Sequence, residues 1–148
     1  MDGGKCKIGV ESTIINLLNE PTLLRFGGLD IPEIEKILKK KVIIKNNSKK
    51  TIAPGQFPLH YSPGIPLRMN AKKPKKEEAF LLTKKRKISY ENYYYLSKKN
   101  DMKESAKNLY SLLRKIKNDG YKMVAVEKIQ NKGIGRTIND RLNKASKY

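Results

Sequence analysis

The sequence predicts an α/β protein built around a small, mainly parallel sheet. Short apolar segments alternate with amphipathic helical segments along most of the chain, the pattern of strands joined by crossover helices. The 148 residues suffice for one ordinary domain or two small ones, and 38% of them are apolar, enough for a buried core. A proline-rich stretch over residues 45–65 separates the pattern into two parts.

The first part is expected to contain two strands, over residues 8–18 and 22–25, separated by a polar turn. A helix should begin after Asp30, a good N-cap residue that is followed by Pro32 and Glu33 in the first turn. Its predicted buried stripe consists of Ile31, Ile34, Ile37 and Leu38. Residues 42–45 are a candidate for a further short strand.

The second part repeats the α/β pattern. Its candidate strands are residues 66–70, 79–83, 93–96 and 123–129. A clear amphipathic helix is expected over 102–118, with Asp101 and Glu104 as its capping pair and Gly120 at its end. The apolar stripe of this helix consists of Ala106, Leu109, Leu113 and Ile116. A last helix is expected over about 135–146.

Composition limits the classes of protein. No apolar run approaches the ~20 residues that cross a bilayer. The first residues lack the charged and then apolar pattern of a secretory signal. The single cysteine, Cys6, excludes an intrachain disulfide framework and suits a reducing compartment. A cytoplasmic location is therefore expected.

The formal net charge of +19 is typical of proteins that bind polyanions such as RNA. However, only 6 of the 33 basic residues are arginine, the side chain that suits bidentate phosphate contacts. Abundant lysine, isoleucine and asparagine also fit a coding bias towards A- and T-rich codons. Both interpretations of the charge remain open.

Residues 45–65 have no sustained periodicity and are interpreted as a linker. This stretch nevertheless contains Phe57 and the only histidine of the chain, His60, which is followed by Tyr61. A plain spacer needs no such cluster of aromatic and imidazole side chains.

Four ordered segments together resemble the threonylcarbamoyl-AMP synthase family of the Sua/YrdC type. Two are "DGGKCKIGVESTIINL" at 2–17 and "LLRFGGLDIPEIEKIL" at 23–38. The third is "APGQFPLHYSP" at 53–63, and the fourth is the tail, with "SAKNLYSLLRKI" at 105–116 and "KGIGRTINDRLNKAS" at 132–146. The tail resembles the extra C-terminal domain of the long form of this enzyme. Residues 68–101 match least well.

The resemblance implies an α/β fold in three parts. Residues 1–44 would be the truncated C-terminal part of a YrdC-like catalytic domain. Residues 45–65 would be an interdomain linker and lid, and residues 66–148 a Rossmann-like, mainly parallel C-terminal domain.

The resemblance also implies an activity. The enzyme is a nucleotidyltransferase that joins L-threonine, bicarbonate and ATP into threonylcarbamoyl-AMP and releases pyrophosphate, with Mg²⁺ assisting. A separate transferase then places the threonylcarbamoyl group on an adenosine beside the tRNA anticodon. Such a site must hold a carboxylate against the α-phosphate in a fixed geometry.

By the same resemblance, Ser12 would bind the threonine substrate, and Arg25 and Tyr61 would bind ATP. His60 and Ser62 would make contacts from the lid, which excludes water from a labile mixed anhydride. None of these residues is assigned as a catalytic acid or base. Without the surrounding pattern, Ser12 is an ordinary strand hydroxyl and Arg25 a surface charge, and a structural role for His60 remains an alternative.

Two departures from the family pattern stand out. The acidic residue that usually follows the Ser-Thr strand is Asn16 here. Phe57, Pro58 and Leu59 stand where many relatives are basic, which puts phosphate contacts from that segment in doubt.

Other site motifs are weaker. "KGIGRTI" at 132–138 resembles the start of a dinucleotide loop, but Ile138 takes the place of the third glycine, so a tight turn into a helix is the better interpretation. The chain has no Cys/His cluster for zinc and no hydrolase motif. No metal site is predicted.

If the resemblance holds, the family's Lys/Arg cluster for the triphosphate and much of the catalytic sheet would precede Met1. Residues 1–44 alone would be marginally stable, and the chain alone is expected to make no threonylcarbamoyl-AMP. Three interpretations remain open. The chain is part of a synthase (a split gene product or a truncated record), a non-catalytic basic module that contacts tRNA or a tRNA-modification partner, or an inert gene fragment.

Overall fold

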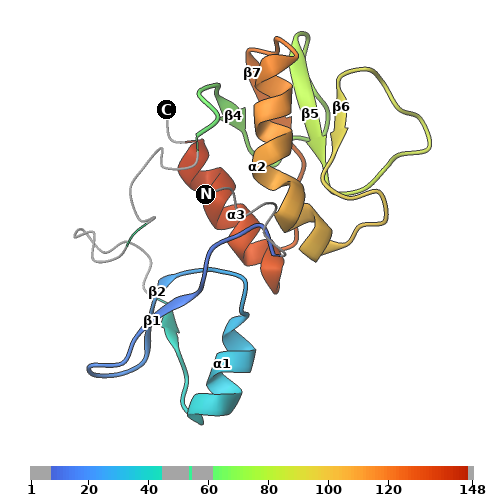
Figure 1. Cartoon of the computed structure of the whole chain (residues 1–148). Coiled ribbons are helices and arrows are strands. Elements are labelled where there is room, and N and C mark those ends of the chain that lie inside the picture. Colours follow the sequence, from blue (N-terminus) through green and yellow to red (C-terminus); the bar gives the residue numbers. More distant parts are fainter. Residues whose placement is uncertain (1–7, 45–53, 55–61, 147–148) are drawn as a thin grey trace, which may run out of the picture.

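The computed structural model describes residues 8–44, 54 and 62–146. Within these residues the chain forms two separate sheets and three helices (Figure 1). The smaller sheet contains strands β1 (Ile14–Asn16), β2 (Thr22–Arg25) and β3 (Ile43–Ile44), with helix α1 (Ile31–Leu38) connecting β2 to β3. The larger sheet contains strands β4 (Leu67–Arg68), β5 (Glu78–Leu82), β6 (Tyr93–Tyr95) and β7 (Met123–Val126), with helices α2 (Met102–Asn118) and α3 (Ile134–Ala145).

The smaller sheet has the order β1-β2-β3, in which β1 is antiparallel to β2 and β2 is parallel to β3. The predicted strand over 8–18 is wrong in length, since only residues 14–16 join the sheet. Residues before β1 contact the loop after β2 instead of a strand. The amide of Gly28, for example, donates to the carbonyl of Glu11 at 3.0 Å.

Helix α1 begins as predicted, because the Asp30 carboxylate accepts a hydrogen bond from the Ile31 amide at 2.9 Å. Ile31 packs in a small core with Leu23 and Val42. The predicted burial of Ile37 is wrong, since its side chain is 77% exposed. Leu38 faces this core, and Ile37 lies about 100° around the helix axis from it. Because the helix is short and the sheet beneath it is narrow, the side chain of Ile37 remains in solvent.

The larger sheet has the order β4-β7-β5-β6, and every neighbouring pair is parallel. The predicted mainly parallel sheet is therefore confirmed. All five residues of β5 are buried, as expected for a central strand of a parallel sheet.

One face of this sheet carries both α2 and α3, with a common core (Figure 1). Alternate strand residues such as Leu81 and Val126 point into that core, which also contains Leu109 and Leu142 of the two helices. The opposite face carries a second, smaller cluster that contains Phe80, Leu82 and Ala125. The architecture of residues 62–146 is thus a two-layer α/β arrangement.

The bounds of α2 match the predicted 102–118. The Asp101 carboxylate accepts hydrogen bonds from the amides of Lys103 at 2.7 Å and Glu104 at 3.2 Å. The predicted capping pair of Asp101 and Glu104 is joined through Ser97. The amide of Asp101 donates to the Ser97 hydroxyl, which in turn donates to the Glu104 carboxylate at 2.5 Å. Gly120, with a φ of +91°, ends the helix as expected.

Helix α3 lies between the larger sheet and the β1–β2–α1 unit (Figure 1). Its buried side chains include Ile138 and Leu142 on the sheet side, and Thr137 and Arg141, which contact residues near the start of the chain. In the described part of the chain, no helix is both long and apolar enough to cross a membrane.

Candidate substrate-binding site

Two of the residues predicted to bind substrates, Ser12 and Arg25, contact each other. The Arg25 guanidinium donates from Nη2 to the Ser12 hydroxyl at 3.1 Å and from Nε to the Ser12 carbonyl at 3.0 Å. Its Nη1 donates to the carbonyl of Pro54 at 3.3 Å. The structure therefore brings the "GVEST" and "LLRFGG" motifs and one residue of the linker to a single point.

The segments that carry this pair are held together through their backbones. The Thr13 hydroxyl donates to the Leu29 carbonyl at 2.7 Å and accepts from the Leu29 amide at 3.2 Å. A Cβ atom on Gly27 would lie 2.2 Å from backbone atoms of Ser12 and Thr13. The two segments are therefore so close together that only a glycine fits at position 27. Thr13 and Gly27 thus have structural roles that fix the Ser12–Arg25 pair.

Asn16, which departs from the family pattern, caps the turn after β1. Its side-chain oxygen accepts a hydrogen bond from the Leu18 amide at 2.8 Å. This arrangement is a local turn that an asparagine favours, and it explains the residue without a substrate contact.

Helix α3 contacts the same two motifs. The Arg141 guanidinium donates to the Glu11 carboxylate at 2.9 and 3.1 Å and to the Phe26 carbonyl at 2.8 Å. The Thr137 hydroxyl donates to the Gly27 carbonyl at 2.8 Å. Sequence reasoning did not identify either residue. The available signal was the position of Arg141 on the same helical face as Ile138 and Ala145, where a charged side chain is unusual.

The residues predicted to make contacts from a lid are only partly described. Ser62 accepts a hydrogen bond from the Gly64 amide at 3.1 Å and lines a pocket of about 600 Å³. Glu11, Arg114 and Lys117 also line this pocket, which places Ser62 close to the α3-bound motif. His60 and Tyr61 lie outside the described residues.

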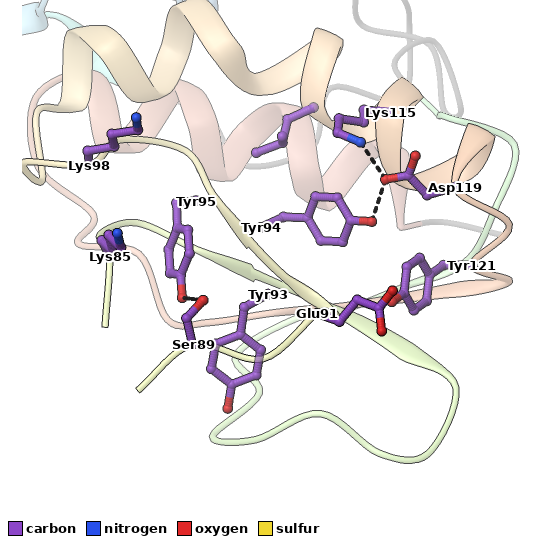
Figure 2. A pocket seen from close by; sticks show the side chains of 11 residues that line it. Lys85, Ser89, Glu91, Tyr93, Tyr94, Tyr95, Lys98, Lys115, Asp119 and Tyr121 are labelled. Carbon is purple, nitrogen blue, oxygen red and sulfur yellow. Dashed lines mark hydrogen bonds and ion pairs between the residues drawn. The ribbon is translucent and has the colours of Figure 1, made fainter. Parts of the chain in front are cut away.

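A second pocket, of about 780 Å³, lies between β6 and α2 (Figure 2). The Asp119 carboxylate accepts hydrogen bonds there from the Tyr94 hydroxyl at 2.6 Å and from Lys115 Nζ at 2.7 Å. These two donors hold the pKa of Asp119 below its usual range, with the Lys115 bond as the larger cause. Burial, followed by the bond to Asp119, raises the pKa of Tyr94. Of the predicted site residues that the structure describes (Ser12, Arg25 and Ser62), none lines this pocket.

The residues described by the structure contain no group of three or more His, Cys, Asp or Glu side chains that could hold a metal ion. The carboxylate next to Ser12 in the sequence, Glu11, is bound by Arg141. The described residues therefore offer no preformed cluster of such side chains beside Ser12.

The "KGIGRTI" segment forms a tight turn into α3, as interpreted from the sequence. Gly133 has a φ of +55°, and a Cβ on Gly135 would lie 2.1 Å from the carbonyl oxygen of Gln130. The first glycine serves the turn and the second a close backbone approach.

Three curated relatives match nearly the whole chain. The threonylcarbamoyl-AMP synthase of Pyrococcus abyssi is 33% identical over 168 residues, which cover 100% of this chain and 49% of that protein. The synthase of Bacillus subtilis is 28% identical, and the match covers 99% of this chain and 48% of that protein. That of Schizosaccharomyces pombe is 28% identical, with 99% and 44% covered. The chain thus spans about half the length of these curated relatives.

Two solved structures share the fold. The crystal structure of P. abyssi Sua5 complexed with L-threonine matches with a TM-score of 0.79 and 29% identity, over 98% of this chain and 48% of that chain. A structure of P. abyssi Sua5 in which an adjacent histidine and tyrosine are both replaced by alanine matches with a TM-score of 0.76 and 28% identity, over 98% and 47%. The family profile "Threonylcarbamoyl-AMP synthase, C-terminal domain" matches residues 29–147, and the chain therefore belongs to this family.

Proposed function

We propose that the chain is the C-terminal part of an L-threonylcarbamoyladenylate synthase, which makes threonylcarbamoyl-AMP from L-threonine, bicarbonate and ATP for modification of tRNA. The contact between Ser12 and Arg25 is the observation that supports this most, because it joins at one point two motifs chosen from the sequence for substrate binding. The likeness to a Sua5 structure that holds L-threonine supports the same proposal.

In this proposal, Ser12 binds L-threonine through its hydroxyl group. Arg25 binds the phosphates of ATP, because a planar guanidinium with five N–H donors matches phosphate oxygens. The threonine nitrogen first forms a bond to the carbon of bicarbonate, while a C–O bond of bicarbonate breaks and that oxygen leaves as water with a proton from the amine. An oxygen of the resulting carbamate then attacks the α-phosphorus. The bond from the α-phosphorus to the bridging oxygen breaks, and pyrophosphate leaves with that electron pair. Arg25 stabilises negative charge on the phosphates during this step.

His60, Tyr61 and Ser62 form the lid contacts of this proposal, with Tyr61 on the nucleotide. The structure of P. abyssi Sua5 with a replaced histidine and tyrosine shows that this protein also contains an adjacent His-Tyr pair. In the present chain the only such pair is His60 and Tyr61, because His60 is its only histidine. A lid suits this product because water hydrolyses a mixed carbonic–phosphoric anhydride.

We further propose that residues 8–44 pack against the part of the catalytic domain that this chain does not contain. Six of the nine large apolar side chains that are exposed among the described residues lie in this stretch. They are Ile8, Leu17, Leu18, Leu29, Ile37 and Ile44. Such an apolar surface is typical of an interface. The chain alone is accordingly inactive, and a downstream tRNA threonylcarbamoyl transferase uses the product of the complete enzyme.

In this proposal Mg²⁺ assists as an ion bound to the phosphates of ATP, the usual arrangement of this ion at nucleotide sites. No role of the residues named above depends on it.

The test compares the chain alone with the same chain produced together with the polypeptide encoded immediately upstream of Met1. Pyrophosphate release that requires both threonine and bicarbonate is measured. We expect release from the assembly and none from the chain alone. Loss of release in Ser12→Ala and Arg25→Lys, but not in Arg86→Lys, would assign the two site residues. Failure of the assembly to release pyrophosphate would contradict the proposed activity.

The net charge of +19 supports a second candidate function, a basic module that contacts tRNA. Its test is the binding of tRNA at two salt concentrations, since phosphate neutralisation makes affinity fall steeply with added salt. Binding that does not change with salt would contradict it.

A further inference from the structure

Arg141 is the largest fully buried side chain among the described residues, and its charge is directed at the start of the chain. Its guanidinium donates two hydrogen bonds to one oxygen of the Glu11 carboxylate, at 2.9 and 3.1 Å, and one to the Phe26 carbonyl at 2.8 Å. It also contacts the carboxylate of its neighbour Asp140. A buried cation with such partners is held in one orientation.

The two distant partners of Arg141 flank the candidate site in the sequence. Glu11 immediately precedes Ser12, and Phe26 immediately follows Arg25. Because consecutive Cα atoms are a fixed distance of about 3.8 Å apart, holding the neighbour on each segment restricts where Ser12 and Arg25 can lie relative to each other. Thr137, one turn earlier on α3, adds a bond to the Gly27 carbonyl at 2.8 Å.

We propose that Arg141 is a positioning residue, through which helix α3 sets the geometry of the Ser12–Arg25 pair. The consequence for catalysis rests on the function proposed above. Arg141 itself is not proposed to touch a substrate. It acts because a site that aligns a nucleotide with a second substrate loses rate when its contacts move by even about 1 Å.

The geometry requires an arginine rather than any cation. Glu11 and the Phe26 carbonyl belong to different segments, and a planar fork reaches both at once. A lysine at this position keeps the charge but presents a single nitrogen. Arg141→Lys is therefore the informative variant, because it removes the planar set of donors and keeps the positive charge.

The test uses the chain itself and the NMR signals of the arginine Nε–H groups. The chain has only six arginines, so these signals can be assigned by single substitutions. The signal of Arg25 reports its bond to the Ser12 carbonyl, and that of Arg68 reports a bond to Glu78 in the larger sheet. The Arg68 signal thus serves as an internal measure of folding.

In Arg141→Lys we expect the Arg25 Nε–H to exchange with water about tenfold faster or more, because its hydrogen-bonded geometry is no longer held. The Arg68 signal should not change. Arg86→Lys is the matched control, since Arg86 also pairs with a carboxylate, that of Glu127, but contacts neither motif, and it should leave the Arg25 signal unchanged. An unchanged Arg25 signal in Arg141→Lys would overturn the inference.

Should Arg141→Lys fail to fold, as a change of the Arg68 signal would reveal, Thr137→Val provides the milder test. This substitution keeps the shape of the side chain and removes only the bond to Gly27. Faster exchange at Arg25 with an unchanged Arg68 signal would support positioning by α3. No change at Arg25 would count against it.

A kinetic measurement distinguishes this inference from the proposed function. In the assembly that releases pyrophosphate, Arg141→Lys should lower kcat/KM, and Arg86→Lys should not. A change at Arg25 without any change in kcat/KM would overturn the catalytic consequence. If no assembly releases pyrophosphate, the proposed function is lost, whereas the NMR comparison still decides whether α3 positions the pair.

Discussion

The carboxylate of Glu11 lies 2.9 Å from the guanidinium of Arg141, although 130 positions separate the two residues. This contact joins the first motif of the chain to its last helix. The smaller sheet has only a small core around Leu23, Ile31 and Val42, so it gains much of its support from such contacts. The two parts of the chain should consequently be coupled in stability.

We predict that Arg141→Met lowers the free energy of unfolding by about 3 kcal/mol or more, because removing one partner of a buried ion pair leaves the other groups poorly satisfied. Urea denaturation followed by circular dichroism measures this. Arg86→Met is the control. Its ion pair with Glu127 is partly exposed, so the loss should be under about 1 kcal/mol. Equal losses for the two variants would contradict the prediction.

We predict that Glu78 contributes to stability in a pH-dependent way. Its buried carboxylate accepts hydrogen bonds from Arg68 and from the Lys75 amide, and the Arg68 bond is the main reason that its pKa lies below the usual range. The folded state therefore favours the ionised form. This stabilisation is present above the ordinary glutamate pKa of about 4.3 and is lost as the pH falls through the lower folded-state pKa.

The measurement is the free energy of unfolding between pH 7 and pH 3 for the unaltered chain and for Glu78→Gln. The unaltered chain should lose more stability on acidification, with an extra slope of up to about 1.4 kcal/mol per pH unit from this one proton. Parallel curves for the two chains would show that Glu78 does not titrate in the expected way.

Helix α2 could be predicted from the sequence because its determinants are local. The cap Asp101, the apolar spacing from Ala106 to Ile116 and the terminal Gly120 all lie within or beside the helix. The parallel sheet also followed from the alternation of strands and helices. Strand β1 was predicted too long, because the residues before it, such as Glu11, pair with a loop rather than with a strand, and periodicity does not distinguish these partners.

The candidate site was predictable in part. Ser12 and Arg25 were chosen by resemblance to a family, and the structure adds that they contact each other. Arg141 was missed because its role depends on a contact between distant parts of the chain, which no local pattern encodes. Its position on a buried helical face was the only available sign.

We predict that Leu109→Ala costs about 2–5 kcal/mol, since the side chain is fully buried between α2 and the larger sheet and its removal leaves a cavity. Ile37→Ala is the comparison on α1. Because that side chain is largely exposed, its removal should change the free energy of unfolding by under about 0.5 kcal/mol. Both values come from chemical denaturation, and a large loss for Ile37→Ala would mean that its surface is covered in solution.

Finally, we predict that substitution by alanine destabilises the chain to very different degrees at two glycines of the C-terminal part. Gly135→Ala should destabilise the chain severely, by more than about 4 kcal/mol, because its Cβ would lie 2.1 Å from the Gln130 carbonyl oxygen, a backbone atom that cannot rotate away. Gly120→Ala meets no atom within 4 Å and suffers only from its φ of +91°, which should cost about 1 kcal/mol. Thermal unfolding of the two variants measures the difference. Similar melting temperatures would show that the turn into α3 can shift, and that α3 is a less rigid support for the Ser12–Arg25 pair than the structure indicates.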